Sequence, residues 1–163
     1  MSDDPIKDVL HMMPYGFYAV TSKNGNDVNA MVANWIVQVS FEPRLVAFGL
    51  QKTSYTHQLV AAGKVFAVNL FADSDEEAIK AYTKSHAKNP DKLTGVDYET
   101  APKTGCPILP GAAAWFEVRV KQIVDVGGDH DVVIGEAVGA GVKKEMDVTD
   151  TLSLPKIGWS YAG

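Results

Sequence analysis

The stretch NAMVANWIVQVSFEPRLVAFGLQKTSYT, residues 29–56, is the part of this sequence that decides the fold. Residues 31–37 predict a strand whose apolar run is interrupted by small, polar and aromatic side chains, so it resembles a binding platform more than a simple core strand. A turn at Glu42-Pro43 and an apolar strand over residues 45–50 follow. The stretch ends in a polar cluster, residues 52–56, that opens an amphipathic segment.

The polar cluster has two interpretations. Ser54 and Thr56 at a helix start leave backbone N–H groups and hydroxyls available to a phosphate group. Helix capping uses the same geometry and explains both residues equally well. Lys52 would either supply a point charge to the phosphate or be a solvated surface lysine. A platform strand followed by an anion site suits a ligand with a flat head and a phosphate tail, and FMN has that shape.

Length, composition and charge narrow the class of protein. We expect the 163 residues to form a single domain, residues 1–163, with 46% hydrophobic and 21% charged residues as in ordinary globular proteins. The net charge of -5 disfavours sequence-independent nucleic-acid binding. The absence of a long apolar run and the acidic start MSDDPIKDVL predict a cytoplasmic protein without membrane attachment. The single cysteine, Cys106, predicts a buried apolar side chain, and no His or Cys spacing suggests a metal site.

The rest of the chain predicts hairpins and short helices. Asp4-Pro5 opens a capped helix that ends by Pro14, and Asn24-Gly25 marks a tight hairpin after a strand over residues 15–21. A short helix is expected next, from His57 to a stop at Gly63, followed by a strand over residues 64–71 and a helix that Asp73 opens. A long surface loop is expected over residues 87–111. The last predicted element is a hairpin of two strands, residues 114–126 and 132–142. The fold predicted is mainly β: an antiparallel barrel with peripheral short helices and no GxGxxG turn.

Five stretches resemble, in order and spacing, the flavin reductase-like family. They are ANWIVQVSFEP (33–43), Ser54-Tyr55-Thr56, GKVFAVNLF (63–71), KLTGVDYETAPKTGCPIL (92–109) and GDHDVVIGEAV (128–138). The platform is most similar to flavin reductase domains related to diflavin flavoproteins. The resemblance implies a Greek-key split β-barrel, generally homodimeric, that binds FMN, with FAD as an alternative, and takes hydride from NADH or NADPH. Arg44 and the tail LPKIGWSYAG (154–163) depart from the family pattern, which leaves the roles of Trp159 and Tyr161 open.

The candidate cofactor-binding residues come from the platform and the polar cluster. They are Met31, Val32, Ala33, Asn34, Trp35, Ile36, Gln38, Lys52, Ser54, Tyr55 and Thr56. Alternation along a strand would put Asn34 and Gln38 on one face, where they would meet the pyrimidine edge of a flavin or serve as structural polar groups. Trp35 favours packing or a subunit interface. Asn69, an amide in an apolar strand, would orient a loop near the flavin or satisfy backbone groups.

His130 is the candidate catalytic residue. It lies in Gly128-Asp129-His130-Asp131, where a turn tolerates such residues without any function. The resemblance implies instead a ring at the flavin edge where nicotinamide enters, oriented by the neighbouring carboxylates. The sequence therefore predicts an NAD(P)H-dependent flavin reductase, with an electron-accepting partner protein as a further expectation. The alternatives are a non-catalytic flavin electron carrier and a split barrel that binds haem or a deazaflavin.

Overall fold

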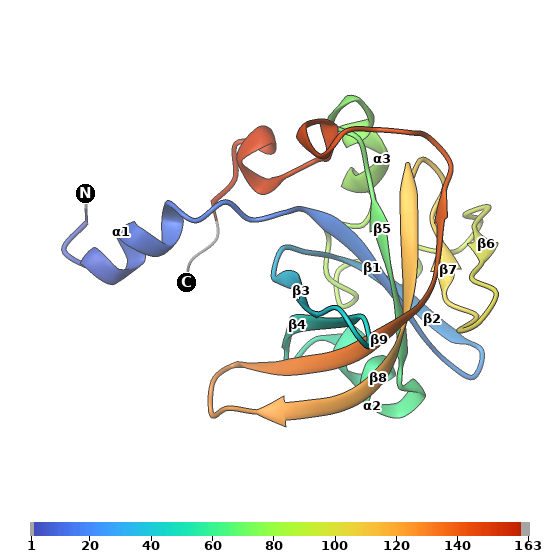
Figure 1. Ribbon diagram of the computed structural model, residues 1–163. Helices are drawn as coiled ribbons and strands as arrows, with labels where there is room; N and C mark the ends of the chain where they lie inside the picture. The colour runs from blue at the N-terminus through green and yellow to red at the C-terminus, as the bar shows by residue number, and fades with distance from the viewer. Residues whose placement is uncertain (1, 161–163) are drawn as a thin grey trace.

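The computed structural model describes residues 2–160, and Figure 1 shows a barrel of strands with short helices around it and one helix standing apart. The strands are β1 (Tyr18–Asn24), β2 (Asp27–Ala33), β3 (Ile36–Ser40), β4 (Leu45–Gln51), β5 (Val65–Leu70), β6 (Glu99–Thr100), β7 (Pro107–Ile108), β8 (Ala114–Asp125) and β9 (His130–Val142). The helices are α1 (Pro5–His11), α2 (Tyr55–Gly63) and α3 (Glu76–Lys80), with 3-10 turns η1 (Asp73–Asp75), η2 (Val148–Asp150) and η3 (Leu154–Ile157).

Seven strands form one antiparallel sheet in the order β2-β1-β5-β8-β9-β4-β3, and β6 pairs with β7 separately. The hairpins β1-β2 and β8-β9 join neighbours in the chain, whereas β1-β5 and β4-β9 bring together distant strands through crossovers, as Greek-key barrels do. Both predicted hairpins and the mainly β, antiparallel architecture are confirmed.

Two apolar cores hold the fold. One fills the barrel and takes side chains from strands at both ends of the sheet order, Ala33 of β2 and the partly buried Ile36 of β3, and it contains the fully buried Phe48 and Phe66. The other lies between the barrel and the segments around α3, and contains Phe71 among others. Because side chains from both sheet edges share the first core, the sheet closes on itself.

The prediction of one continuous platform strand is wrong, because residues 31–37 are divided between two strands, β2 and β3. Asn34 and Trp35 belong to neither β2 nor β3, which lie at opposite ends of the sheet order. A continuous strand cannot occupy both edges of the barrel, so the chain leaves the ladder here. Trp35 instead packs over Gly49, whose N–H donates to the Trp35 carbonyl at 2.9 Å and where an added Cβ would lie 3.2 Å from the Trp35 side chain.

The short helix expected after the polar cluster is α2, but its stop differs from the prediction. Gly63 is still helical, and Lys64 adopts the left-handed conformation that ends the helix, with φ 58°. A Cβ on Gly63 would lie 1.9 Å from the Lys23 carbonyl oxygen of β1. The glycine is therefore required for close packing of α2 on the barrel rather than for its backbone freedom.

Residues 87–111 form a loop that is partly buried, so the prediction of a loop on the surface is wrong for residues 92–93 and for much of the second half. This segment contains β6 and β7, and Cys106 and Leu109 are fully buried. The Leu109 N–H donates to Asn69 Oδ1 at 2.9 Å, and the buried Glu117 carboxylate accepts from the Thr104 N–H at 2.7 Å. Barrel side chains thus supply the acceptors that let this loop enter the core. The predicted burial of Cys106 is confirmed.

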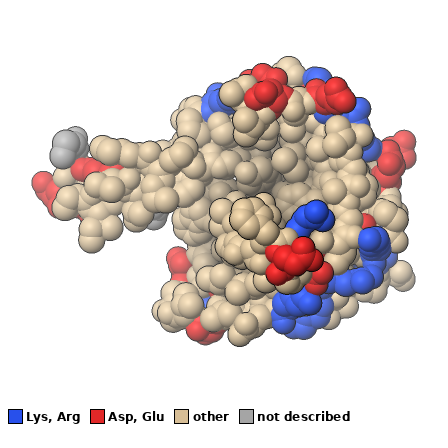
Figure 2. All heavy atoms as spheres, in the orientation of Figure 1, with Lys and Arg blue, Asp and Glu red and all other residues tan. Residues whose placement is uncertain are grey.

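The helix α1 projects from the barrel, as Figures 1 and 2 show. Asp4 caps it as predicted, accepting from the N–H groups of Ile6 and Lys7, yet none of its residues is buried. Ile6 is 72% exposed and Met12 is 73% exposed. Within residues 2–160, no helix has the length and apolar character needed to cross a membrane.

Candidate functional site

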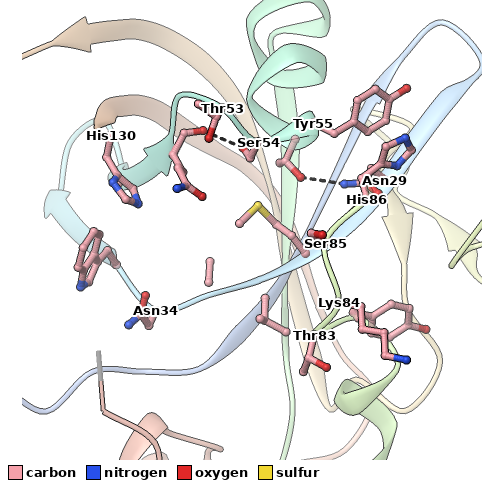
Figure 3. A pocket seen from close by; sticks show the side chains of 18 of the residues that line it. Asn29, Asn34, Thr53, Ser54, Tyr55, Thr83, Lys84, Ser85, His86 and His130 are labelled. Atoms are coloured by element: carbon pink, nitrogen blue, oxygen red, sulfur yellow. Dashed lines mark hydrogen bonds between the residues drawn. The ribbon is translucent and has the colours of Figure 1, made fainter. Parts of the chain in front are cut away.

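A cavity of about 580 Å³ opens between the barrel and the segment after α3. Its walls come from β2, the Asn34-Trp35 connection, the start of α2, residues 82–87, the first residue of β9 and the C-terminal segment. Figure 3 shows Thr53 and Ser54 on one side and Thr83 and Ser85 on the other. The volume lies within the usual range of small-molecule sites.

One end of the cavity, here called the aromatic end, is formed by His130 and Asn34, which Figure 3 labels, and by Trp35, whose ring contacts His130. The ring centroids of Trp35 and His130 are 4.8 Å apart with an interplanar angle of 61°, and the ring centroids of Tyr15 and Trp35 are 6.4 Å apart. An edge-to-face arrangement of this kind is favourable and fixes the rings relative to one another.

His130 is held at the cavity by its neighbours in the chain. Its Nδ1 lies 2.7 Å from Asp129 Oδ1, and this hydrogen bond, together with the charge of His130, holds the pKa of Asp129 below its ordinary value. As the first residue of β9, His130 pairs with Gln51 at the end of β4. The structure therefore brings the predicted catalytic residue to the cavity wall with one ring nitrogen already oriented.

Asn34 carries an unpartnered donor at the same end. Its Nδ2 is buried and has no hydrogen-bond partner among the described residues, and Asn34 lines the cavity. A buried amide without a partner costs free energy, so such a group is informative when it lines a cavity. Met31, Val32 and Ala33 of β2 also line the cavity, as their place in the predicted platform implied.

The start of α2 forms the adjoining wall and confirms the capping interpretation of Ser54. Ser54 Oγ accepts from the His57 N–H at 3.1 Å and donates to the Gln51 carbonyl at 2.8 Å. Thr56 is buried, and its Oγ1 accepts from Asn29 Nδ2 at 3.0 Å, which leaves the Thr56 O–H as a donor. Ser54, Tyr55 and Thr56 all line the cavity.

Lys52 does not line the cavity, contrary to the expectation of a point charge beside Ser54. Its Nζ lies 2.6 Å from Asp125 Oδ1 and 3.7 Å from Asp131 Oδ1, and Asp131 Oδ2 lies 2.7 Å from His57 Nε2. The hydrogen bond to Asp125 raises the pKa of Lys52. These contacts join the β8-β9 hairpin to the start of α2, so Lys52 has a structural partner already.

Ile36 and Gln38 also lie away from the cavity. They line a separate groove of about 280 Å³ beside β3 and β4, and Gln38 Nε2 donates to the Ser40 carbonyl at 3.1 Å. The expected shared face of Asn34 and Gln38 is wrong because the strand is interrupted at residues 34–35, so the alternation of faces does not continue across the break.

Apart from Tyr55, the sequence did not predict the residues of the opposite end of the cavity, here called the polar end. It is formed by Tyr55 together with Ser85, His86 and Lys92, and Figure 3 shows Tyr55 and His86 side by side, away from His130. The Tyr55 and His86 rings stack with centroids 3.7 Å apart and an interplanar angle of 18°. The available signal was the run TKSHAKN (83–89), which is polar, lacks apolar periodicity and follows a short helix.

The C-terminal segment also reaches the cavity. Trp159 lines it and packs edge-to-face on Phe17, with centroids 5.6 Å apart, and Leu154 is anchored by its N–H to the Tyr15 carbonyl at 3.0 Å. Trp159, whose role the sequence left open, thus packs on Phe17 at the cavity, while Tyr161 lies outside the described residues.

Comparison with known proteins places this arrangement in a family. The model of the flavin reductase like domain matches residues 10–154. The high molecular weight rubredoxin of Moorella thermoacetica is 30% identical over 135 residues, 82% of this chain and 58% of the relative. The putative diflavin flavoprotein A 3 of Nostoc is 30% identical over 135 residues, 82% of this chain and 23% of the relative. The chain thus spans only part of the length of these two relatives.

A solved structure gives the same result. The NADH:FAD oxidoreductase of Streptomyces globisporus matches with a TM-score of 0.73 and 30% identity, covering 82% of this chain and 79% of that chain. The matched fold and the matched residues agree with the resemblance drawn from the motifs. The chain therefore belongs to the flavin reductase-like domain family.

Proposed function

We propose that this protein binds FMN in the cavity and reduces flavin with NADH or NADPH. The observation that carries the proposal is the buried, unpartnered Nδ2 of Asn34 beside the aromatic end of a cavity of about 580 Å³. A flavin ring offers a flat apolar surface and a polar pyrimidine edge, so the donor and the walls fit this cofactor. When bound, the flavin supplies the hydride chemistry.

The aromatic end would hold the ring. Met31, Val32 and Ala33 form an apolar wall of the cavity. Trp35 forms the aromatic end, where its ring packs edge-to-face against the ring of His130. The Asn34 amide would donate to a carbonyl of the pyrimidine edge, where reduction increases negative charge and a donor stabilises it.

The start of α2 would position the phosphate. The first backbone N–H groups of a helix have no intrahelical acceptor, and the Thr56 O–H remains a donor. Ser54 has a supporting part: its two hydrogen bonds set the backbone of this turn. Lys52 acts outside the cavity by joining the hairpin to α2.

His130 would orient the nicotinamide. The Asp129 contact fixes Nδ1, which leaves Nε2 to donate to, or accept from, the carboxamide of the reductant. Its contribution is orientation: a correctly held donor avoids most of the entropic cost of bringing two ligands together. The same relative solved with NAD and FAD fragments supports the presence of both ligands in this family, and FAD is the alternative flavin for this chain.

Anaerobic titration with NADH tests the proposal. The purified protein is loaded with FMN and freed of excess, and the flavin absorbance is followed as NADH is added. Bleaching with a stoichiometry of one NADH per flavin is the expected result. Protein that binds FMN but is not bleached by NADH or NADPH is an electron carrier, and protein that binds no flavin contradicts the proposal.

A homodimer is the proposed assembly. Apolar side chains of α1 and of the β3 region are exposed, among them Val9 at 61%, Val37 at 61% and Phe41 at 87%. A single chain leaves these surfaces uncovered, and a second copy would bury them. Sedimentation velocity should give a dimer that Val9→Asp and Phe41→Asp weaken, whereas a monomer at all concentrations contradicts the assembly.

The destination of the electrons is also a proposal. A reduced flavin passes its electrons either to a released flavin or to a partner protein, and the longer relatives support the second route because they contain this domain beside further sequence. Because NADH and NADPH are the proposed reductants, we infer a cytoplasmic location.

A further inference from the structure

A buried carboxylate, Asp131, joins the start of β9 to the start of α2. Asp131 is 7% exposed, and its Oδ2 lies 2.7 Å from Nε2 of His57, in the first turn of α2. Its Oδ1 has no hydrogen-bond partner among the described residues and lies 3.7 Å from Lys52 Nζ. Burial of a carboxylate is costly unless a close partner compensates it. The short contact with His57 is therefore the main interaction that makes this burial tolerable.

Lys52 does not take the place of His57 in this contact. Asp131 lies directly opposite Asp125 in the β8-β9 ladder, and like charges in such a pair are destabilising. Lys52 Nζ makes its short contact with Asp125, at 2.6 Å, and only the longer one with Asp131. Two carboxylates thus share one lysine, and the close partner of Asp131 is His57.

The contact lies directly behind the residue that faces the aromatic end. His130 precedes Asp131 in β9, and successive residues of a strand point to opposite faces. His130 accordingly packs against Trp35 at the cavity, while Asp131 reaches α2. Neither His57 nor Asp131 is among the residues that line the cavity, so neither touches a ligand there.

The first residues of β9 depend on such support because the hairpin turn is remote from the core. Figure 1 shows this turn reaching past the neighbouring strands, and residues 125–129 are exposed. The backbone anchors nearby are the pairing of His130 with Gln51 and the hydrogen bond from the Lys52 N–H to the Asp129 carbonyl, at 3.0 Å. Exposed strand ends open locally at a low free-energy cost, so a side-chain contact at this point helps to fix His130.

We propose that the contact between His57 and Asp131 positions His130 at the aromatic end, which makes both members positioning residues of the site. The inference rests on the proposed function for the reaction that His130 serves. Tyr55 and Thr56, which precede His57 in the chain, line the cavity, so the contact also fixes the cofactor wall relative to His130. Reaction between two bound ligands tolerates little displacement, and a loosened His130 would slow it.

Single-turnover reduction of the FMN-loaded protein by NADH tests the proposal. His57→Phe keeps a ring and removes Nε2, whereas His57→Gln keeps an amide donor close to that position. We expect His57→Phe to lower the limiting rate about 3- to 10-fold, and to change the Kd for FMN by less than about twofold. His57→Ala, which adds no bulk, should give the same result, and His57→Gln should restore most of the rate. Glu77→Gln breaks the exposed ion pair with Lys80 on α3 and is the matched control, with an unchanged rate.

A double-mutant cycle distinguishes positioning from a general loss of stability. In the His130→Ala background, His57→Phe should slow reduction by less than about twofold, because the residue through which it acts is absent. Equal slowing in both backgrounds overturns the proposal. Wild-type kinetics in His57→Phe, or a loss of rate that only follows a loss of FMN affinity, overturn it as well.

Hydrogen exchange in the flavin-free protein separates this proposal from the proposed function. The amides of residues 129–133 should exchange faster in His57→Phe than in the wild type and in Glu77→Gln. If this pattern holds but the wild type binds no flavin, the positioning of His130 stands and the flavin function fails. If NADH reduces the bound flavin, and neither the rate nor the exchange changes in His57→Phe, the positioning fails and the flavin function stands.

Discussion

Removing the Ser54 hydroxyl should reduce stability and leave the preference for FMN intact. The hydroxyl accepts from the His57 N–H at 3.1 Å and donates its one proton to the Gln51 carbonyl at 2.8 Å. No donor is left for a phosphate group. Loss of a helix cap costs about 0.5–2 kcal/mol, and a chain of this size loses about 2–4 °C of Tm per kcal/mol. Ser54→Ala should therefore lower the Tm by about 1–8 °C.

Two measurements on the same protein test this expectation. Thermal unfolding followed by circular dichroism gives the Tm, and fluorescence titration gives the Kd for FMN and for riboflavin. Asp4→Ala is one control: it removes a cap from α1, which buries no residue, and should leave the Tm of the barrel unchanged. Thr53→Ala is the other, because Thr53 lines the cavity beside Ser54 without capping α2.

The ratio of the Kd for FMN to the Kd for riboflavin shows whether the Ser54 hydroxyl caps the helix or binds phosphate. In Ser54→Ala the FMN and riboflavin affinities should change together, by less than about threefold, because any effect acts through the backbone of the turn. A selective loss of FMN affinity of about tenfold or more, with an unchanged Tm, would refute the reasoning and make the hydroxyl a direct phosphate ligand.

Three further predictions follow from the site and its supports. His130→Ala should leave the Kd for FMN unchanged and slow flavin reduction by NADH about 5- to 30-fold in single-turnover stopped flow. This is the effect expected for the loss of one orienting hydrogen bond. Unchanged rates at every NADH concentration would show that His130 is only a turn residue. Cys106, whose pKa burial raises to about 11, should react with thiol reagents at pH 8 only after unfolding in guanidinium, and rapid labelling of native protein would contradict its burial. Lys52 holds the pKa of Asp125 below its ordinary value, so their ion pair stabilises the fold at neutral pH and is lost as the pH falls through that lowered pKa. Lys52→Met should thus lower the Tm at pH 7 but not in stronger acid, and equal losses at both pH values would rule out the pair as the cause.

Local sequence patterns were enough for the elements that depend on neighbours in the chain. Asp4-Pro5 caps a helix, Asn24-Gly25 joins β1 to β2, and the alternation of residues 114–142 forms the β8-β9 hairpin. Each of these is set by contacts within a few residues or by a period of two, so no knowledge of the remaining fold is needed. The motifs likewise identified the family, and they predicted many of the residues that line the cavity.

The composition of the cavity was decided by tertiary structure. The platform breaks at Asn34-Trp35 because β2 and β3 lie at the two ends of the sheet order, and a period of two carries no information about where a barrel closes. The break puts Asn34 in the cavity and Gln38 in a separate groove. Gly63 follows the same principle: it was predicted as a helix stop, yet its absent side chain is required by the Lys23 carbonyl of a distant strand.

Charge was the property that sequence could place least well. Lys52 stands two residues before Ser54, but Asp125 and Asp131 from the β8-β9 hairpin take it away from the cavity. Lys92 is distant in the chain and reaches the polar end because the loop that carries it packs into the second core. The sequence by itself determined the strands, the caps and the family, since these arise from local pattern and motif. Which lysine lines the cavity was settled only by the fold, because ion pairing and burial depend on which distant residues become neighbours.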